Sequence, residues 1–178
     1  MPKYVAFLRA INVGGHTVKM DSLRQMFEAI GFANVSTFIA SGNVIFDSKS
    51  KNTKALERKI EDYLQLTLAY SVATFLRSTS ELAEIAGYRP FKDFDLNVKV
   101  PALYIGFISS DPSDESKKKI HSFTSKVDEF HVAGREVYWL CRTKFSDSNI
   151  SSALLEKTLG MQATFRNSTT VRKIATII

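Results

Sequence analysis

Three short polar segments of the chain carry residues that could bind an anion. The first is the loop at residues 12–16, which contains Asn12, Gly14 and Gly15 and is flanked by Arg9 and Lys19. Glycine allows a positive φ or a close approach of the backbone to a ligand, and an asparagine can orient a loop by bonding to its backbone. The loop ends near the start of a predicted helix, where free N–H groups and the helix dipole favour an anion. A tight turn without a ligand would use the same residues.

Arg9 lies in the apolar run 4–11, where a permanently charged guanidinium needs a partner. A phosphate or carboxylate of a ligand could supply that partner in a bidentate pair. A carboxylate from the other half of the chain could supply it equally well, and Arg9 would then be structural. The groups within hydrogen-bond reach of Arg9 therefore distinguish a ligand site from an internal ion pair.

The second polar segment is Ser41-Gly42-Asn43, which is also typical of a hairpin turn without a function. The third is the pair Arg166 and Asn167, expected between the last strand and the closing helix, where Asn167 or Ser168 could simply cap that helix. We predict that the three segments converge at the seam between two halves of the chain and bind a small ligand with a phosphate or carboxylate group. The predicted ligand-binding residues are Arg9, Asn12, Gly14, Gly15, Lys19, Ser41, Asn43, Arg166 and Asn167. The same segments could instead only hold the halves together.

No catalytic residue, cofactor or metal site is predicted. His16 is a single loop histidine, and His121 and His131 fall in different predicted elements. Cys141 ends a predicted apolar strand, which is typical of a small buried hydrophobic residue rather than a nucleophile. The sequence has neither an HExxH motif nor a calcium-loop motif.

The charge of the chain leaves nucleic-acid binding open. The net charge is +6, but 24 basic and 18 acidic residues are mixed in both halves. Lys117, Lys118 and Lys119 form the one basic run, which is also typical of the solvated face of a helix. The alternative function is therefore a nucleic-acid or protein-binding module that uses an open sheet face, although no RNP1 pattern is present.

Cysteine content and hydropathy bear on the compartment. A single cysteine favours a reducing compartment, so we predict a cytoplasmic protein. No segment approaches the roughly 18 apolar residues of a spanning helix, so no membrane partner is expected. The oligomeric state is left open.

Hydrophobic periodicity predicts the order strand, helix, two strands, helix and strand in each half. The first half has strands at 4–11, 35–40, 44–47 and 70–76 and helical stripes that begin at Leu23 and Leu56. Ser78-Thr79-Ser80-Glu81 matches a capping box and begins an extra helix that ends near Gly87. The second half has strands at 98–108, 130–132, 137–141 and 162–165, helices at 111–123 and 147–159, and a closing helix at 168–178.

This order predicts an α+β fold of two tandem ferredoxin-like βαββαβ halves, each followed by an extra helix. The predicted boundaries are 1–87 for the first half, 88–97 for a connector that contains Pro90, and 98–178 for the second half. The repeat rests on the order of the elements, since no aligned identity between the halves is apparent.

Three segments carry a resemblance to a known family: LRAINVGG at 8–15 followed by Lys19, IASGNV at 39–44, and TFRNS at 164–168 followed by Thr170. On these the sequence resembles a bacterial family known as domain of unknown function 1697. The resemblance implies a duplicated ferredoxin-like fold and no established activity. The family pattern has glycine where this chain has Ala10 and tryptophan where it has Ser168.

Overall fold

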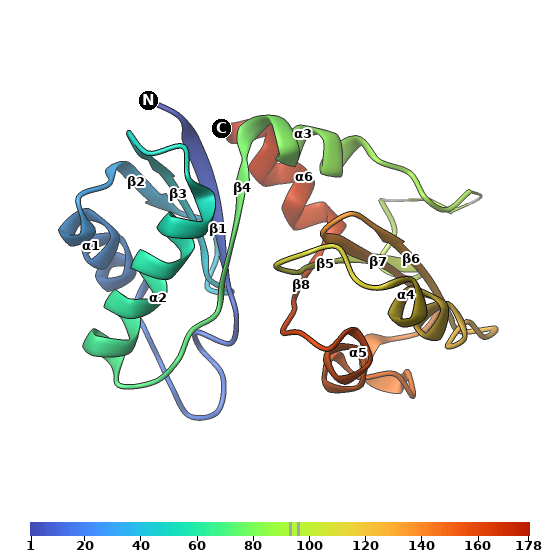
Figure 1. Cartoon of the computed structure of the whole chain (residues 1–178). Coiled ribbons are helices and arrows are strands. Elements are labelled where there is room, and N and C mark those ends of the chain that lie inside the picture. The colour runs from blue at the N-terminus through green and yellow to red at the C-terminus, as the bar shows by residue number, and fades with distance from the viewer. Residues whose placement is uncertain (93, 96) are drawn as a thin grey trace. The chain divides into compact units, whose positions relative to one another are not determined.

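The computed structural model describes residues 1–92, 94–95 and 97–178 (Figure 1). Asp93 and Leu96, both in the predicted connector 88–97, lie outside the described residues. Over the described residues the fold is α+β, with two four-stranded antiparallel sheets and six α-helices. The chain divides into two compact units, Met1–Ala83 with Ile177–Ile178, and Glu84–Thr176. The predicted boundaries at 87 and 98 stay predictions.

The first unit contains one sheet with two helices on one face (Figure 1). Its elements are β1 (Lys3–Leu8), α1 (Met20–Ile30), β2 (Ala33–Thr37), β3 (Asn43–Asp47), α2 (Thr53–Leu68) and β4 (Thr74–Ser78). The strand order is β2-β3-β1-β4, so β1 is central and β4 is an edge strand. Val5 of β1 pairs with Ile45 of β3 and with Arg77 of β4.

The apolar run that predicts the first strand is buried on both sides of the sheet. Successive side chains of a strand point to opposite faces, and Tyr4–Leu8 are all buried. The even-numbered residues of this run join the core formed with α1 and α2. β1 ends at Leu8, three residues before the predicted end, because Ala10 adopts a φ of +54°, which cannot continue a strand.

The second unit repeats this arrangement of elements. They are β5 (Ala102–Phe107), α4 (Asp114–His121), β6 (Asp128–Ala133), β7 (Glu136–Cys141), a 3₁₀ turn (Phe145–Asp147), α5 (Ser152–Leu159), β8 (Thr164–Asn167) and α6 (Ser168–Ile177). The strand order is β6-β7-β5-β8. Trp139 is fully buried in a core that α4 and α5 complete through Ile120, Leu155 and Leu159.

Local sequence signals predicted some ends of helices and strands correctly and other ends incorrectly. α3 (Thr79–Gly87) begins with the predicted capping box, since Ser78 N–H donates to Glu81 Oε2 at 2.8 Å and Glu81 N–H donates to Ser78 Oγ at 3.2 Å. The helix predicted from Asp147 begins only after Ser151, whose Oγ accepts from Leu154 N–H at 3.1 Å. Residues 166–167 are the last of β8 and not a loop.

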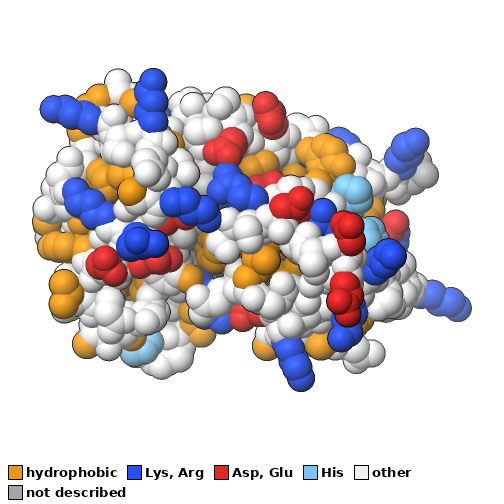
Figure 2. Space-filling model, viewed as in Figure 1, with side chains coloured by type: hydrophobic (Ala, Val, Ile, Leu, Met, Phe, Trp, Pro, Cys, Tyr) orange, Lys and Arg blue, Asp and Glu red, His pale blue; other side chains and the backbone are white. Residues whose placement is uncertain are grey.

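The surface carries charges of both signs. On the face visible in Figure 2, lysine and arginine side chains are interspersed with aspartate and glutamate. None of the described helices combines the length and apolar character needed to cross a lipid bilayer.

Candidate functional site

The structure brings two of the three predicted polar segments together within the first unit. Asn12 Nδ2 donates to the carbonyl of Ala40 at 2.9 Å, and Asn12 Oδ1 accepts from Val18 N–H at 2.6 Å. Leu8 N–H donates to the carbonyl of Gly42 at 2.9 Å. We call residues 9–19 and 38–43 the loop cluster. Asn12 therefore orients the glycine loop, as predicted, and also ties it to the hairpin.

Tyr70 supports the loop cluster from outside the predicted segments. Its hydroxyl donates to the carbonyl of Ile11 at 2.9 Å, and its ring stacks on the ring of His16 with centroids 3.8 Å apart. Burial raises the pKa of the Tyr70 hydroxyl above its ordinary value. The sequence did not indicate this role, because the run 70–76 predicts a strand that includes Tyr70, whereas β4 begins only at Thr74.

The loop cluster contains an unusual concentration of left-handed backbone. Gly14 and Gly15 have φ values of +70° and +84°, and Ala10 and Ile39 reach +54° and +53° without being glycine. For a β-branched residue such a φ is a genuine outlier, and strain of this kind gathers at functional sites. Ile39 and Val13 are also large apolar side chains that are more than half exposed. The strain and the exposure make this cluster the candidate ligand site.

The first turn of α1 follows the glycine loop along the chain and lacks a side-chain cap in the described part of the structure. Lys19 occupies the N-cap position with extended backbone, and no side chain of the described residues caps the helix there. The first intrahelical bond is from Leu23 N–H to the carbonyl of Lys19 at 3.0 Å. Asp21 in this turn is paired with Arg24 at 2.8 Å, so its negative charge is partly neutralised. Lys19 itself is exposed and adds a positive charge.

Other predicted members of the site are engaged with the protein. Asn43 is fully buried, and its Nδ2 donates to the carbonyl of Phe38 at 2.8 Å and to Ser41 Oγ at 2.9 Å, which closes the hairpin. Arg9 is half-buried just after β1, its backbone N–H donates to the carbonyl of Ala73 at 2.9 Å, and the residue makes further interactions within the protein.

Arg166 and Asn167 belong to the second unit. Arg166 Nη1 donates to Thr164 Oγ1 at 2.7 Å and to the carbonyl of Phe165 at 3.0 Å, and the residue is 7% exposed. This burial lowers the pKa of Arg166 to about 10, so the guanidinium stays charged at neutral pH. Asn167 Oδ1 accepts from Thr169 N–H at 2.9 Å and thereby caps α6.

Two histidines expected in unrelated elements lie side by side in the second unit. The ring centroids of His121 and His131 are 6.2 Å apart, and His131 Nε2 lies 2.8 Å from the hydroxyl of Tyr88. The pKa of His131 is lower than its ordinary value, mainly because the ring is partly buried and to a smaller extent because His121 is nearby. Among residues 1–92, 94–95 and 97–178, no group of three or more His, Cys, Asp or Glu side chains could hold a metal ion.

The family match covers the first unit and much of the second. Residues 1–138 match the family described as Protein of unknown function (DUF1697). The chain belongs to this family. The matched residues include the whole loop cluster, whereas Arg166 and Asn167 lie beyond the matched range.

A solved structure extends the likeness of fold to nearly the whole chain. The conserved bacterial protein SP0830 from Streptococcus pneumoniae superposes with a TM-score of 0.73 and 21% sequence identity, covering 99% of this chain and 98% of that chain. At this level of identity the likeness concerns the fold alone. No curated protein sequence matches the chain.

Proposed function

We propose that the loop cluster binds a small ligand that carries a phosphate or carboxylate group. The observation that carries this proposal is the uncapped first turn of α1, preceded by two glycines of positive φ and flanked by the exposed ammonium of Lys19. Free N–H groups at a helix start and an adjacent cation both favour a bound anion. The protein would act in the cytoplasm, as its single, buried cysteine predicts.

The predicted residues have different roles in this proposal. Gly14, Gly15 and Lys19 face the ligand in this proposal, because they are exposed in the loop that leads into α1. Asn12 and Asn43 position the loop and the hairpin through the hydrogen bonds described above. The remaining predicted members, Arg9, Ser41, Arg166 and Asn167, stay predictions of the sequence, as does the placement of the site at a seam between halves.

Nuclear magnetic resonance tests the proposal directly, because glycine amide signals fall in a separate region of a ¹⁵N spectrum. Titration with inorganic phosphate and with citrate should shift the amide signals of Gly14 and Gly15. Lys19→Ala should weaken the apparent affinity about 2- to 5-fold, as expected for loss of one exposed charge contact. Lys51→Ala removes an exposed lysine just before α2 and should leave the affinity unchanged. Equal affinities for wild type and Lys19→Ala would refute the proposal.

The alternative function is nucleic-acid or protein binding through a sheet face and the basic surface at 117–119. Lys117 Nζ lies 2.8 Å from a carboxylate oxygen of Asp111, which reduces the local positive charge. Gel shifts with single-stranded RNA and DNA at two salt concentrations distinguish the functions, because polymer binding falls steeply with salt. A purely structural role for the polar segments predicts that neither anions nor polymers bind.

We infer that each half has a ferredoxin-like fold. Supporting this inference are the element order βαββαβ in each unit and the matching strand orders β2-β3-β1-β4 and β6-β7-β5-β8. In both, the first strand of the half is central and pairs antiparallel with the third and fourth strands of that half.

We further infer that the halves arose by internal duplication, on the basis of strand register. Val5 pairs with Arg77 in the first sheet, and Ile105 pairs with Arg166 in the second. This register aligns β1 with β5, so that YVAFL at 4–8 corresponds to YIGFI at 104–108. In this alignment Tyr4 corresponds to Tyr104 and Phe7 to Phe107, and these two identities support the inference.

A further inference from the structure

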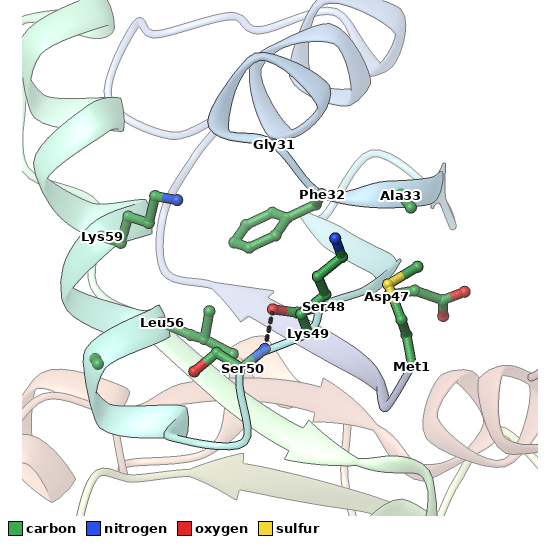
Figure 3. Close-up of a pocket in the computed structure, with 11 residues that line it drawn as sticks. Met1, Gly31, Phe32, Ala33, Asp47, Ser48, Lys49, Ser50, Leu56 and Lys59 are labelled. Atoms are coloured by element: carbon green, nitrogen blue, oxygen red, sulfur yellow. Dashed lines mark hydrogen bonds between the residues drawn. The ribbon is translucent and has the colours of Figure 1, made fainter.

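The first unit contains a pocket of about 460 Å³ that shares no residue with the loop cluster (Figure 3). Pockets that enclose small molecules usually measure about 300 to 1,000 Å³. It lies between the end of α1, the end of β3 and the first turns of α2. Its lining consists of Met1, Gly31, Phe32, Ala33, Asp47, Ser48, Lys49, Ser50, Ala55, Leu56 and Lys59.

Part of the pocket wall is apolar and rigid. The ring of Phe32 stacks on the ring of Phe46 with centroids 4.2 Å apart, and both belong to the core of the unit. Leu56 of α2 faces the same space (Figure 3) and is 4% exposed. Side chains fixed by a packed core offer a preformed apolar surface to a ligand.

Ser48 places a buried donor at the pocket. The residue is 7% exposed, and its Oγ accepts from Ser50 N–H at 3.2 Å. Within the described part of the chain, no acceptor receives the hydroxyl proton of Ser48. Figure 3 shows this oxygen directed into the space between Leu56 and Lys49. Buried hydroxyl groups normally use their donor, so an acceptor on a ligand would satisfy it.

Two ammonium groups reach the pocket from separate elements. Lys59 Nζ donates to the carbonyl of Ile30 at 3.0 Å and lies 5.8 Å from the centroid of the Phe32 ring, which fixes its position. Its other two N–H groups have no acceptor among the described residues. Lys49 extends from the connection between β3 and α2, and in Figure 3 the ammonium groups of Lys49 and Lys59 lie on either side of the Phe32 ring.

The carboxylate of Asp47, the acidic residue of the lining, makes its contacts with Asn34 and Lys3 and not with Lys49 or Lys59. Asp47 Oδ2 accepts from Asn34 Nδ2 at 2.7 Å, and Asp47 Oδ1 lies 3.9 Å from Lys3 Nζ. Figure 3 shows the Asp47 carboxylate directed away from Lys49 and Lys59. With Lys49 and Lys59 against this one carboxylate, the lining has an excess of positive charge, and Asp47 Oδ1 is a buried acceptor without a hydrogen-bond partner among the described residues.

We propose that this pocket binds an amphiphilic anion, that is, a carboxylate or phosphate ester attached to an apolar body. The apolar body packs on Phe32 and Leu56. The anionic oxygens accept from Ser48 Oγ and from the ammonium groups of Lys49 and Lys59. The site is independent of the loop cluster, so either proposal can fail alone.

Calorimetry on the full chain tests the proposal with benzoate and phenyl phosphate as probes and with benzyl alcohol as the neutral control. Both anions should bind, and benzyl alcohol should bind at least about tenfold more weakly, because two charged contacts are lost. Lys49→Ala should weaken anion binding about 2- to 5-fold, whereas Lys51→Ala, two residues away and outside the lining, should not. Lys19→Ala should leave this affinity unchanged.

Ser48→Ala provides a second test, with thermal melting as the check on folding. It should weaken phenyl phosphate binding about 3- to 10-fold through loss of the buried donor. If that variant unfolds, the comparison of Lys49→Ala with Lys51→Ala still decides. Absence of anion binding at ~10 mM probe, equal binding of benzyl alcohol, or equal losses in the two lysine variants would each overturn the proposal.

Discussion

A β-carbon on Gly42 would stand 2.7 Å from Cγ2 of Ile11. It would also lie 3.1 Å from Cβ of Leu8, at the end of the central strand. The hairpin between β2 and β3 can therefore approach the glycine loop this closely only with glycine at position 42. The contact and the hydrogen bonds of Asn12 together hold the loop cluster in one arrangement.

Gly42→Ala should destabilise the protein by about 3 kcal/mol, because it combines left-handed strain with a steric clash. Gly15→Ala is the matched control: its φ of +84° nearly equals the +86° of Gly42, but a β-carbon at Gly15 meets nothing within 4 Å. The control should lose only about 1 to 2 kcal/mol of strain. Urea unfolding measures both, and equal losses would contradict the packing argument.

The sequence predicted the segments of the loop cluster but only part of their arrangement. Residue types marked the glycine loop and the hairpin, because glycine and asparagine have specific uses in turns. The bond from Asn12 to Ala40 joins residues 28 positions apart, and the support from Tyr70 comes from 59 positions beyond Ile11. Such contacts depend on the tertiary fold and leave no local pattern.

Ala10→Gly should stabilise the protein by about 0.5 to 1 kcal/mol. Ala10 adopts a φ of +54°. This conformation is unfavourable for any L-residue with a β-carbon but is readily adopted by glycine. The glycine of the family pattern at this position has the same explanation. Ala29→Gly, on the exposed side of α1, is the control and should destabilise by about 1 kcal/mol. Thermal or urea unfolding measures the change in stability of each variant. A change of the same sign for both variants would contradict the left-handed conformation of Ala10.

Glu61→Gln should alter the pH dependence of stability. Glu61 Oε1 accepts from Thr74 N–H at 2.9 Å on the outer side of edge strand β4, and burial is the main cause that raises the Glu61 pKa. A carboxyl group whose pKa is higher in the folded state than in the unfolded state stabilises the folded protein when it is protonated. This stabilisation is fully present below the unfolded-state pKa of about 4.3 and is lost as the pH rises through the folded-state pKa. The variant keeps the acceptor without the charge.

The stability of Glu61→Gln relative to wild type should therefore increase from about pH 4 to pH 7, by less than about 1 kcal/mol because Glu61 is partly exposed. Glu61→Ala instead leaves the Thr74 N–H without an acceptor and should lose about 1 to 3 kcal/mol at pH 7. Urea unfolding at several pH values separates the two effects. A parallel pH profile for Glu61→Gln and wild type would refute the raised pKa.

Element ends were predicted where a local contact determines them and missed where a distant one does. The capping box of Ser78 and Glu81 is closed within four residues, so its spacing alone indicated it. The start of β4 was predicted at residue 70 because the apolar residues of the run 70–76 are typical of a strand, whereas strand pairing begins only at Thr74. The sequence did not indicate the pocket, because Lys49 and Lys59 line one space only after α2 folds against the sheet.

Asp128→Ala should destabilise the second unit by about 3 kcal/mol. Asp128 is 3% exposed, its Oδ1 accepts from Trp139 Nε1 at 2.8 Å, and its Oδ2 accepts from Ser148 Oγ at 2.8 Å. Removing the carboxylate leaves a buried indole N–H without an acceptor in a packed core. Trp139 is the single tryptophan of the chain, so its fluorescence reports urea unfolding of this unit. Ser148→Ala, which leaves the indole bond intact, should lose about 1 kcal/mol, and a loss equal to that of Asp128→Ala would show that the indole bond contributes little.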